Sequence, residues 1–393
     1  ATALLLRALR EWAQSPTAAL QPLAICPIFP ADCALPSAIV LTLNHTYLWD
    51  RTLALHTLQL GGIDMDELPR FTLDEVADLS VNPNWADLDA DANIALVVDL
   101  EQGTGTCPDR ALAAWLGAQP IPTIGFGESV PEGLEDVFDL TIDQPEELKL
   151  LAERIGQNPI ASAVTVQVLR TSMRLPTSRA LEVESLGYAT LQAGAEYANW
   201  LRASEFRTQS KGTDTPVRMA RHGSDVSITL SDPDSANALG VAMRDALSEA
   251  FQAVSVDASI ESVIVTGDGA HFCAGGDLTE FKRAQDTALS HRIRCLRMPA
   301  RYLAAAAHKY TFKVHGACIG AGIELAAFAD HISAHPDTYF RLPEVAMGLL
   351  PGAGGCVSIP RRIGRQQAAR IMILGQDISA TEALSLGLID AIE

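Results

Sequence analysis

The sequence has few cysteines, no long hydrophobic run and no excess of positive charge, and each absence excludes a class of protein. Its seven cysteines in 393 residues are scattered, odd in number and without a CxxC pair, which argues against a disulfide framework or a zinc site. No apolar stretch approaches the roughly 18 residues that would span a bilayer. We therefore expect a cytoplasmic protein with no metal site.

Acidic residues outnumber basic ones, and the net charge of -19 argues against nucleic acid or anionic membranes as partners. The excess is uneven along the chain. Residues 1–216 contain 13 Lys and Arg against 29 Asp and Glu, a net charge of -16, whereas residues 217–393 contain 16 against 19, a net charge of -3. We expect a polyanionic ligand to be tolerated far better by the second part.

The length favours two domains rather than one. The polar stretch RTQSKGTDTP at 207–216 lacks apolar periodicity and ends in proline, which is typical of a linker. We therefore predict a domain over 1–208, a linker over 209–216 and a second domain over 217–393.

Short apolar runs at 94–100, 122–126 and 137–142 predict strands of an α/β domain in the first part. Apolar residues three and four apart at 145–205 predict a helical block, and residues 1–12 are typical of an amphipathic helix rather than a signal peptide. In the second part, strands are expected at 227–230, 261–267, 310–316 and 331–336, with helices between them.

The first loop that suggests chemistry is HFCAGGDLTEF, at 271–281. Gly275 and Gly276 can adopt backbone angles closed to other residues and let a ligand approach the main chain, and Asp277 is a good helix N-cap. An amide N–H could then point outward. An ordinary tight turn would explain the same residues.

The second loop, in VHGACIGAGIELAAFAD at 314–330, joins a strand to an apolar helix. Amides at the start of a helix favour an oxygen anion beside them. The spacing of GACIGAG does not match a nucleotide-binding GxGxxG loop. Glu324 lies one turn after Ala321 in this apolar helix, so it is either used in chemistry or paired with an arginine.

A second acid in an apolar setting, Glu344, follows a proline in YFRLPEVAMGLLPGAGG at 339–355. Two glutamates in such settings can hold one water between them and split their protonation states. A surface helix that begins with a favourable acid is the alternative for Glu344. PGAGG lacks the Gly-Lys-Ser/Thr ending of a phosphate loop and predicts a tight turn.

Together and in this order, these segments resemble the enoyl-CoA hydratase/isomerase (crotonase) family over about residues 217–393. The likeness begins with SITLSDPDSANAL, runs through FCAGGDL, VHGACIGAGIELA and LPEVAMGLLPGAGG, and closes with GQDISATEALSLGLID. It implies an α/β fold with a crotonase-like ββα spiral core. It also implies an acyl-CoA substrate, no cofactor besides the coenzyme A of that substrate, and a homo-oligomer, a trimer or a hexamer.

The resemblance assigns roles to particular residues. The oxyanion-hole amides of the family correspond to Gly276 and Ala321, and the two glutamates of its hydratases correspond to Glu324 and Glu344. Because both glutamates are present, a 2-enoyl-CoA hydratase is favoured over an isomerase, another enolate-forming enzyme or a non-catalytic scaffold. Residues implied to contact the coenzyme A thioester or to position water are Ala274, Gly275, Asp277, Leu278, Gly320 and Gly352.

Family members continue after the GLID segment with helices that close the active site, whereas this sequence stops at Glu393. Residues 134–170 and 176–205 resemble that missing tail. We therefore interpret residues 1–208 as a degenerate crotonase-like α/β copy without catalytic motifs. Its helical block, 145–205, is expected to cover the core formed by 217–393, preferably within the same chain.

Overall fold

The computed structural model describes residues 70–81, 94–101, 110–205, 213, 215–282 and 286–393. These residues belong to one structural unit, 62–393. The predicted helix at 1–12 and most of the predicted linker at 209–216 lie outside the described residues, and the predicted division of the chain at 208 and 217 stays a prediction.

Four short parallel strands form the first sheet, in the order β1-β2-β3-β4. Their runs LVVD and TIGF are almost wholly buried, as expected for parallel strands. The mixed α/β class is confirmed, with strands inside all three predicted segments. The elements are β1 (Arg70–Thr72), α3 (Leu73–Val81), β2 (Leu96–Asp99), α4 (Arg110–Gly117), β3 (Thr123–Phe126) and β4 (Leu140–Ile142).

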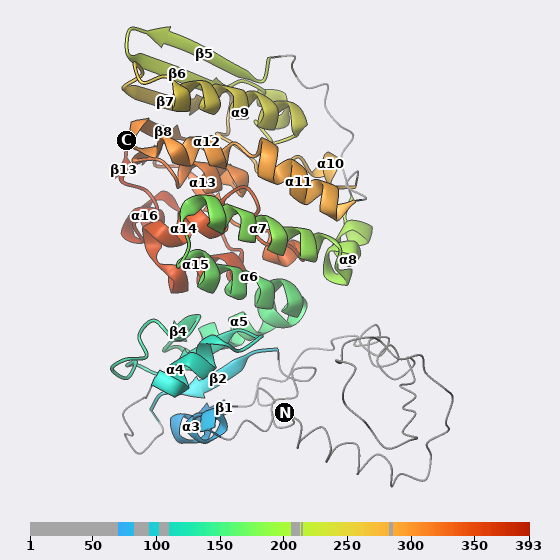
Figure 1. Cartoon of the computed structure of the whole chain (residues 1–393), viewed down its shortest axis with the longest axis vertical. Helices are drawn as coiled ribbons and strands as arrows, with labels where there is room; N and C mark the ends of the chain where they lie inside the picture. The colour runs from blue at the N-terminus through green and yellow to red at the C-terminus, as the bar shows by residue number, and fades with distance from the viewer. Residues whose placement is uncertain (1–69, 82–93, 102–109, 206–212, 214, 283–285) are drawn as a thin grey trace, which may run out of the picture. The chain divides into compact units, whose positions relative to one another are not determined.

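Four consecutive helices follow the sheet, and they match the helical block predicted at 145–205. Prolines begin the first two helices, where a missing N–H costs nothing. Helix α7 contacts α6, α11 and α14, so it lies between its own block and the second part of the chain (Figure 1). The four are α5 (Pro145–Gln157), α6 (Pro159–Ser172), α7 (Thr177–Gln192) and α8 (Ala195–Ala203).

The second part of the chain contains a six-stranded and a three-stranded sheet. The larger has the order β13-β10-β8-β7-β6-β5, parallel except for the β5–β6 hairpin. The smaller has the order β12-β11-β9. The strands are β5 (Val217–His222), β6 (Asp225–Leu230), β7 (Ser262–Gly267), β8 (Tyr310–Val314), β9 (Ala317–Ile319), β10 (His331–Ala334), β11 (Tyr339–Arg341), β12 (Ile378–Ser379) and β13 (Ala391–Ile392).

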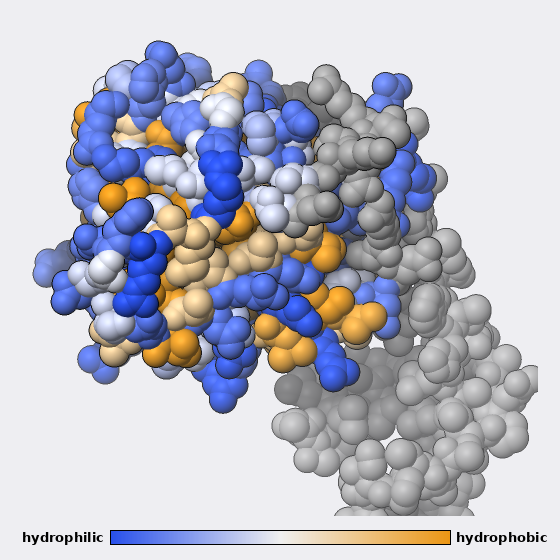
Figure 2. All heavy atoms as spheres, turned by 90° about the horizontal axis from the view of Figure 1, so that it is seen from above, coloured by the Kyte–Doolittle hydropathy of each residue, from blue (hydrophilic) through white to orange (hydrophobic). Residues whose placement is uncertain are grey.

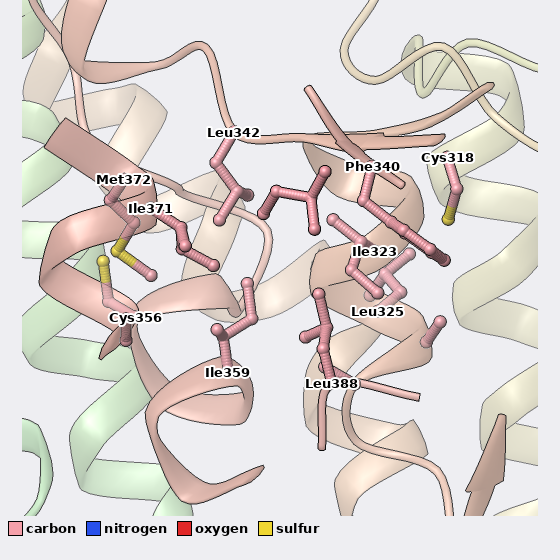
Figure 3. Close-up of a cluster of buried hydrophobic side chains, with 14 of the residues drawn as sticks. Cys318, Ile323, Leu325, Phe340, Leu342, Cys356, Ile359, Ile371, Met372 and Leu388 are labelled. Carbon is pink, nitrogen blue, oxygen red and sulfur yellow. The ribbon is translucent and has the colours of Figure 1, made fainter. Parts of the chain in front are cut away.

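Helices alternate with these strands, and the four strands predicted in this part are present. The helices are η3 (Pro233–Ser235), α9 (Val241–Val256), α10 (Leu278–Phe281), α11 (Thr287–Arg297), α12 (Ala300–Ala305), η4 (Ala307–Lys309), α13 (Ala321–Ala326), η5 (Val345–Met347), α14 (Gly355–Ile363), α15 (Arg365–Leu374) and α16 (Ala380–Ser385). Buried side chains of α13, β11, α14 and α15, among them Ile323, Phe340 and Ile359, point toward one another in Figure 3. This packing fixes the short helix that carries Glu324.

A buried ion cluster joins the first sheet to the helices. Asp139 is fully buried and accepts hydrogen bonds from Thr123, Arg170 and Arg365. The Arg365 Nη1 to Asp139 Oδ1 distance is 2.7 Å. Removing one partner of such a cluster would leave a buried charge uncompensated.

The surface is mixed in character. The face in Figure 2 carries a band of hydrophobic residues between hydrophilic ones. Some large apolar side chains are exposed to solvent, among them Met219, Val256 and Ile264. Within the described ranges, no helix has the length and apolar character needed to cross a membrane.

Candidate functional site

The two glycine-rich loops of the second part lie side by side. The backbone of Cys273 accepts a hydrogen bond from the Ile319 amide at 2.9 Å and donates one to the Ala317 carbonyl at 3.1 Å. A Cβ atom added to Gly320 would lie 3.7 Å from the Cα of Gly275. Both glycines have positive φ, +93° at Gly275 and +47° at Gly320, so side chains are disfavoured where the loops meet.

Each loop contributes one amide that has no acceptor. The Gly320 amide donates to the Arg341 carbonyl and the Asp277 amide to the Leu239 carbonyl. By contrast, the amides of Gly276 and Ala321 have no hydrogen-bond partner among the described residues. Ala321 is buried and Gly276 is partly buried, and amides in such places are normally paired. The two unpaired N–H groups on adjoining loops are therefore available to an oxygen atom of a ligand.

Glu324 is a buried carboxyl held by backbone amides. Its side chain is 2% exposed, and Oε2 accepts hydrogen bonds from the amides of Ala353 at 2.7 Å and Gly355 at 2.9 Å. Burial raises the pKa of Glu324 to about 7, against the opposing effect of these two donors. None of the ion pairs among the described residues includes Glu324. The alternative interpretation, a glutamate paired with an arginine, is therefore wrong.

Glu344 has a different environment. It directly precedes η5, which agrees with the alternative of an acid at the start of a surface helix. However, its Oε2 is buried and has no hydrogen-bond partner in the described part of the chain. A Cβ on Gly320 would collide with its Oε1, so Glu344 borders the second loop. Burial, and next the charge of Glu324, raise the pKa of Glu344 well above its usual range.

A third carboxyl, Glu184 of α7, was missed in the sequence. Its Oε1 accepts from the Gly354 amide at 2.8 Å and its Oε2 from the Cys356 amide at 2.9 Å. Burial, followed by the charge of Glu324, raises its pKa, while the two amides oppose the rise. The signal was present: Glu184 interrupts an apolar stripe that includes Ala180 and Leu191.

The turn after Glu344 is therefore shared by two acids. Consecutive amides from Ala353 to Cys356 donate alternately to Glu324 and to Glu184. The preceding Gly352 lies against Tyr188, whose ring would collide with a Cβ at that position. Burial raises the pKa of Tyr188. A helix from the first part of the chain thus supplies one wall of the site.

Four of the predicted residues line a groove of about 760 Å³. Asp277 caps α10, accepting from the Thr279 amide at 2.9 Å. The groove is lined by Ala274, Gly276, Asp277 and Leu278, but not by Gly275, Gly320 or Gly352. Its described lining includes five acidic side chains and no Lys or Arg, so it favours an uncharged ligand group over a phosphate group.

Metal binding finds no support in the described segments, where no group of three or more His, Cys, Asp or Glu side chains could hold an ion.

The comparisons with known proteins concern the second part of the chain. A family model described as enoyl-CoA hydratase/isomerase matches residues 221–393. YhaR of Bacillus subtilis (strain 168), named as an enoyl-CoA hydratase/isomerase, is 33% identical over 185 residues, which are 44% of this chain and 68% of that protein. The 2,3-dehydroadipyl-CoA hydratase of Escherichia coli (strain K12) is 34% identical over 162 residues, 41% of this chain and 63% of the relative.

Coverage of these relatives is partial. The chain spans just under two thirds, 63%, of the Escherichia coli hydratase. Among solved structures, the enoyl-CoA hydratase from Thermoplasma volcanium GSS1 is 31% identical, with 45% of this chain and 71% of that chain covered and a TM-score of 0.42. On its sequence likeness to relatives such as YhaR, the chain belongs to the enoyl-CoA hydratase/isomerase family, within the crotonase superfamily.

Proposed function

We propose that the second part of the chain adds water across the α,β double bond of a 2-enoyl-CoA. The observation that carries the proposal is the pair of buried carboxyls, Glu324 and Glu344, next to two unpaired backbone amides. Two acids in different hydrogen-bond environments are what general acid-base chemistry requires.

The amides of Gly276 and Ala321 would bind the thioester oxygen. As water adds to the β-carbon, negative charge moves onto this oxygen and an enolate forms. Two N–H donors fixed in advance stabilise that charge more in the transition state than in the ground state. Isomerisation and other enolate reactions of acyl-CoA would use the same donors.

The acids divide the proton transfers. Glu324, whose oxygen is held by two amides, would position the water and accept its proton. Glu344, whose pKa is raised by burial and by the charge of Glu324, would give a proton to the α-carbon. Macroscopic pKa values would belong to the coupled group rather than to either acid alone.

The two alternatives to a hydratase differ from it in their products. An isomerase would form an acyl-CoA with a shifted double bond, and a non-catalytic scaffold would form no product. A buried carboxyl oxygen without a partner, as in Glu344, costs free energy and is poorly explained by a purely structural role. We further propose that the enzyme is cytoplasmic, needs no cofactor besides the coenzyme A of its substrate, and assembles as a homo-oligomer.

The test is incubation with crotonyl-CoA and with longer 2-enoyl-CoAs while the absorbance of the conjugated thioester is followed. Chromatography of the products separates a 3-hydroxyacyl-CoA from an acyl-CoA with a shifted double bond. Formation of the hydroxy product supports the proposal. A product with a shifted double bond would establish an isomerase. If no substrate is converted, the non-catalytic scaffold is the interpretation that remains.

A further inference from the structure

A second, smaller cavity lies between α7 and α11, which are in contact and run side by side in Figure 1. Its volume is about 80 Å³, large enough for a few non-hydrogen atoms. It is lined by both helices and by Gly352, the residue directly before the turn that holds Glu324. The cavity is therefore adjacent to the proposed acid pair.

The cavity contains a largely buried cation, Arg294. Its guanidinium lies 4.2 Å from the centre of the Tyr188 ring. Among the described residues, its side chain donates hydrogen bonds to Ser185 alone, from Nε to Oγ at 3.2 Å and from Nη2 to the carbonyl at 3.4 Å. No carboxylate of the described residues forms an ion pair with it. Buried arginines are usually paired.

Two acids also line the cavity, but neither forms an ion pair with Arg294. Glu184 interacts with Arg294 through its charge, yet both of its oxygens accept hydrogen bonds from backbone amides. Glu182 pairs with Arg179 at the exposed surface. A second cation, Arg301, also lines the cavity. The planar guanidinium of Arg294 has N–H groups beyond the two that bond to Ser185, and it matches a carboxylate in shape and charge.

We propose that this cavity binds the far end of the acyl chain, and that this end carries a carboxylate held by Arg294. The inference rests on the proposed function, because the reacting carbons must lie between Glu324 and Glu344. Tyr188 links the two places: it packs on Gly352 and lies under the guanidinium. The preferred substrate is then a short 2-enoyl-CoA with a terminal carboxylate.

The test uses two six-carbon substrates that differ only at the chain end, 2,3-dehydroadipyl-CoA and 2-hexenoyl-CoA. A charge-assisted hydrogen bond corresponds to roughly 10- to 100-fold in kcat/KM, so the full-length protein should prefer the carboxylated substrate by that factor. Arg294→Met should abolish the preference, so that the ratio of kcat/KM for the two substrates falls to about one.

Two further variants separate binding from folding. Arg294→Lys keeps the charge but not the planar fork, and part of the preference should survive. Arg297→Met alters the same helix at a residue that pairs with Asp245 outside the cavity, and it should leave the preference intact. Equal losses of both substrates in Arg294→Met, or no preference in the unaltered protein, would overturn the assignment.

Calorimetry with the saturated thioesters adipyl-CoA and hexanoyl-CoA distinguishes this inference from the hydratase proposal. Tighter binding of adipyl-CoA that depends on Arg294 would support the carboxylate site even if neither enoyl substrate is hydrated. Equal affinity for both thioesters would contradict the site, whatever the reaction.

Discussion

Replacement of Glu184 by alanine tests whether α7 is part of the site or only covers it. The change removes the acceptors of two buried amides, those of Gly354 and Cys356. Each unsatisfied amide costs about 1–3 kcal/mol, and loss of a buried acid that repels Glu324 offsets part of this. We expect Glu184→Ala to lower the free energy of unfolding by roughly 2–4 kcal/mol.

The assay is urea unfolding of the full chain at neutral pH, with activity measured in parallel. Glu182→Ala is a matched control, because Glu182 lies on the same helix and makes an exposed ion pair with Arg179. Such pairs contribute about 0–1 kcal/mol. If the turn positions Glu324, Glu184→Ala should also lower kcat more than it raises KM.

Glu184→Gln provides an intermediate case. The side-chain amide of glutamine keeps one oxygen that can accept from one backbone N–H of the turn, but its NH2 group faces the other backbone N–H and cannot accept from it. Its stability and kcat should lie between those of the alanine variant and the unaltered protein. Equal stability of Glu184→Ala and Glu182→Ala would refute the reasoning, since the amides of the turn would then not depend on α7.

Four other outcomes are expected. Glu324→Gln and Glu344→Gln should each lower the hydration rate by about 100-fold or more without unfolding the protein, as circular dichroism would show; near-normal rates in both would rule out the hydratase. Gly276→Pro removes one proposed oxyanion donor, so turnover should fall more than coenzyme A affinity. Burial raises the pKa of Glu324 from 4.5 to about 7, so the stability that this group contributes is complete below pH 4.5 and is lost as pH rises through 7. The loss amounts to about 3 kcal/mol of unfolding free energy. Urea unfolding at a series of pH values should therefore show a weaker pH dependence for Glu324→Gln than for the unaltered protein. Residues 217–393 alone should aggregate or lose activity, and adding 145–208 as a separate chain should partly restore both; a soluble, active fragment would contradict this.

Features with local causes could be predicted from the sequence. The apolar runs of the parallel strands, the periodicity of α5 to α8 and the Asp277 cap all depend on residues close together in the chain. The glycine loops were also readable, because positive φ at Gly275 and Gly320 leaves few other residues possible. The same holds for two acids in apolar segments.

Features that join distant segments could not be predicted. Glu184 meets its amide partners 170 and 172 residues along the chain, and Arg294 meets Ser185 109 residues away. Nothing in either local pattern identifies the partner. The burial of Arg294 depends on where α7 packs, which its own helix does not determine.

The dependence of the site on α7 has a consequence for its acid-base chemistry. With α7 in place, Glu324 is buried, and this burial raises its pKa to about 7. Without α7, the turn from 353 to 356 would lose two acceptors and become accessible to water, so the pKa of Glu324 would move down toward its ordinary value. A carboxylate with a lower pKa accepts a proton less readily, so the proton transfer proposed for Glu324 would become slower. Under the proposed hydration, packing of the helical block would therefore contribute to the rate as well as to stability, although the block itself carries none of the residues assigned to proton transfer.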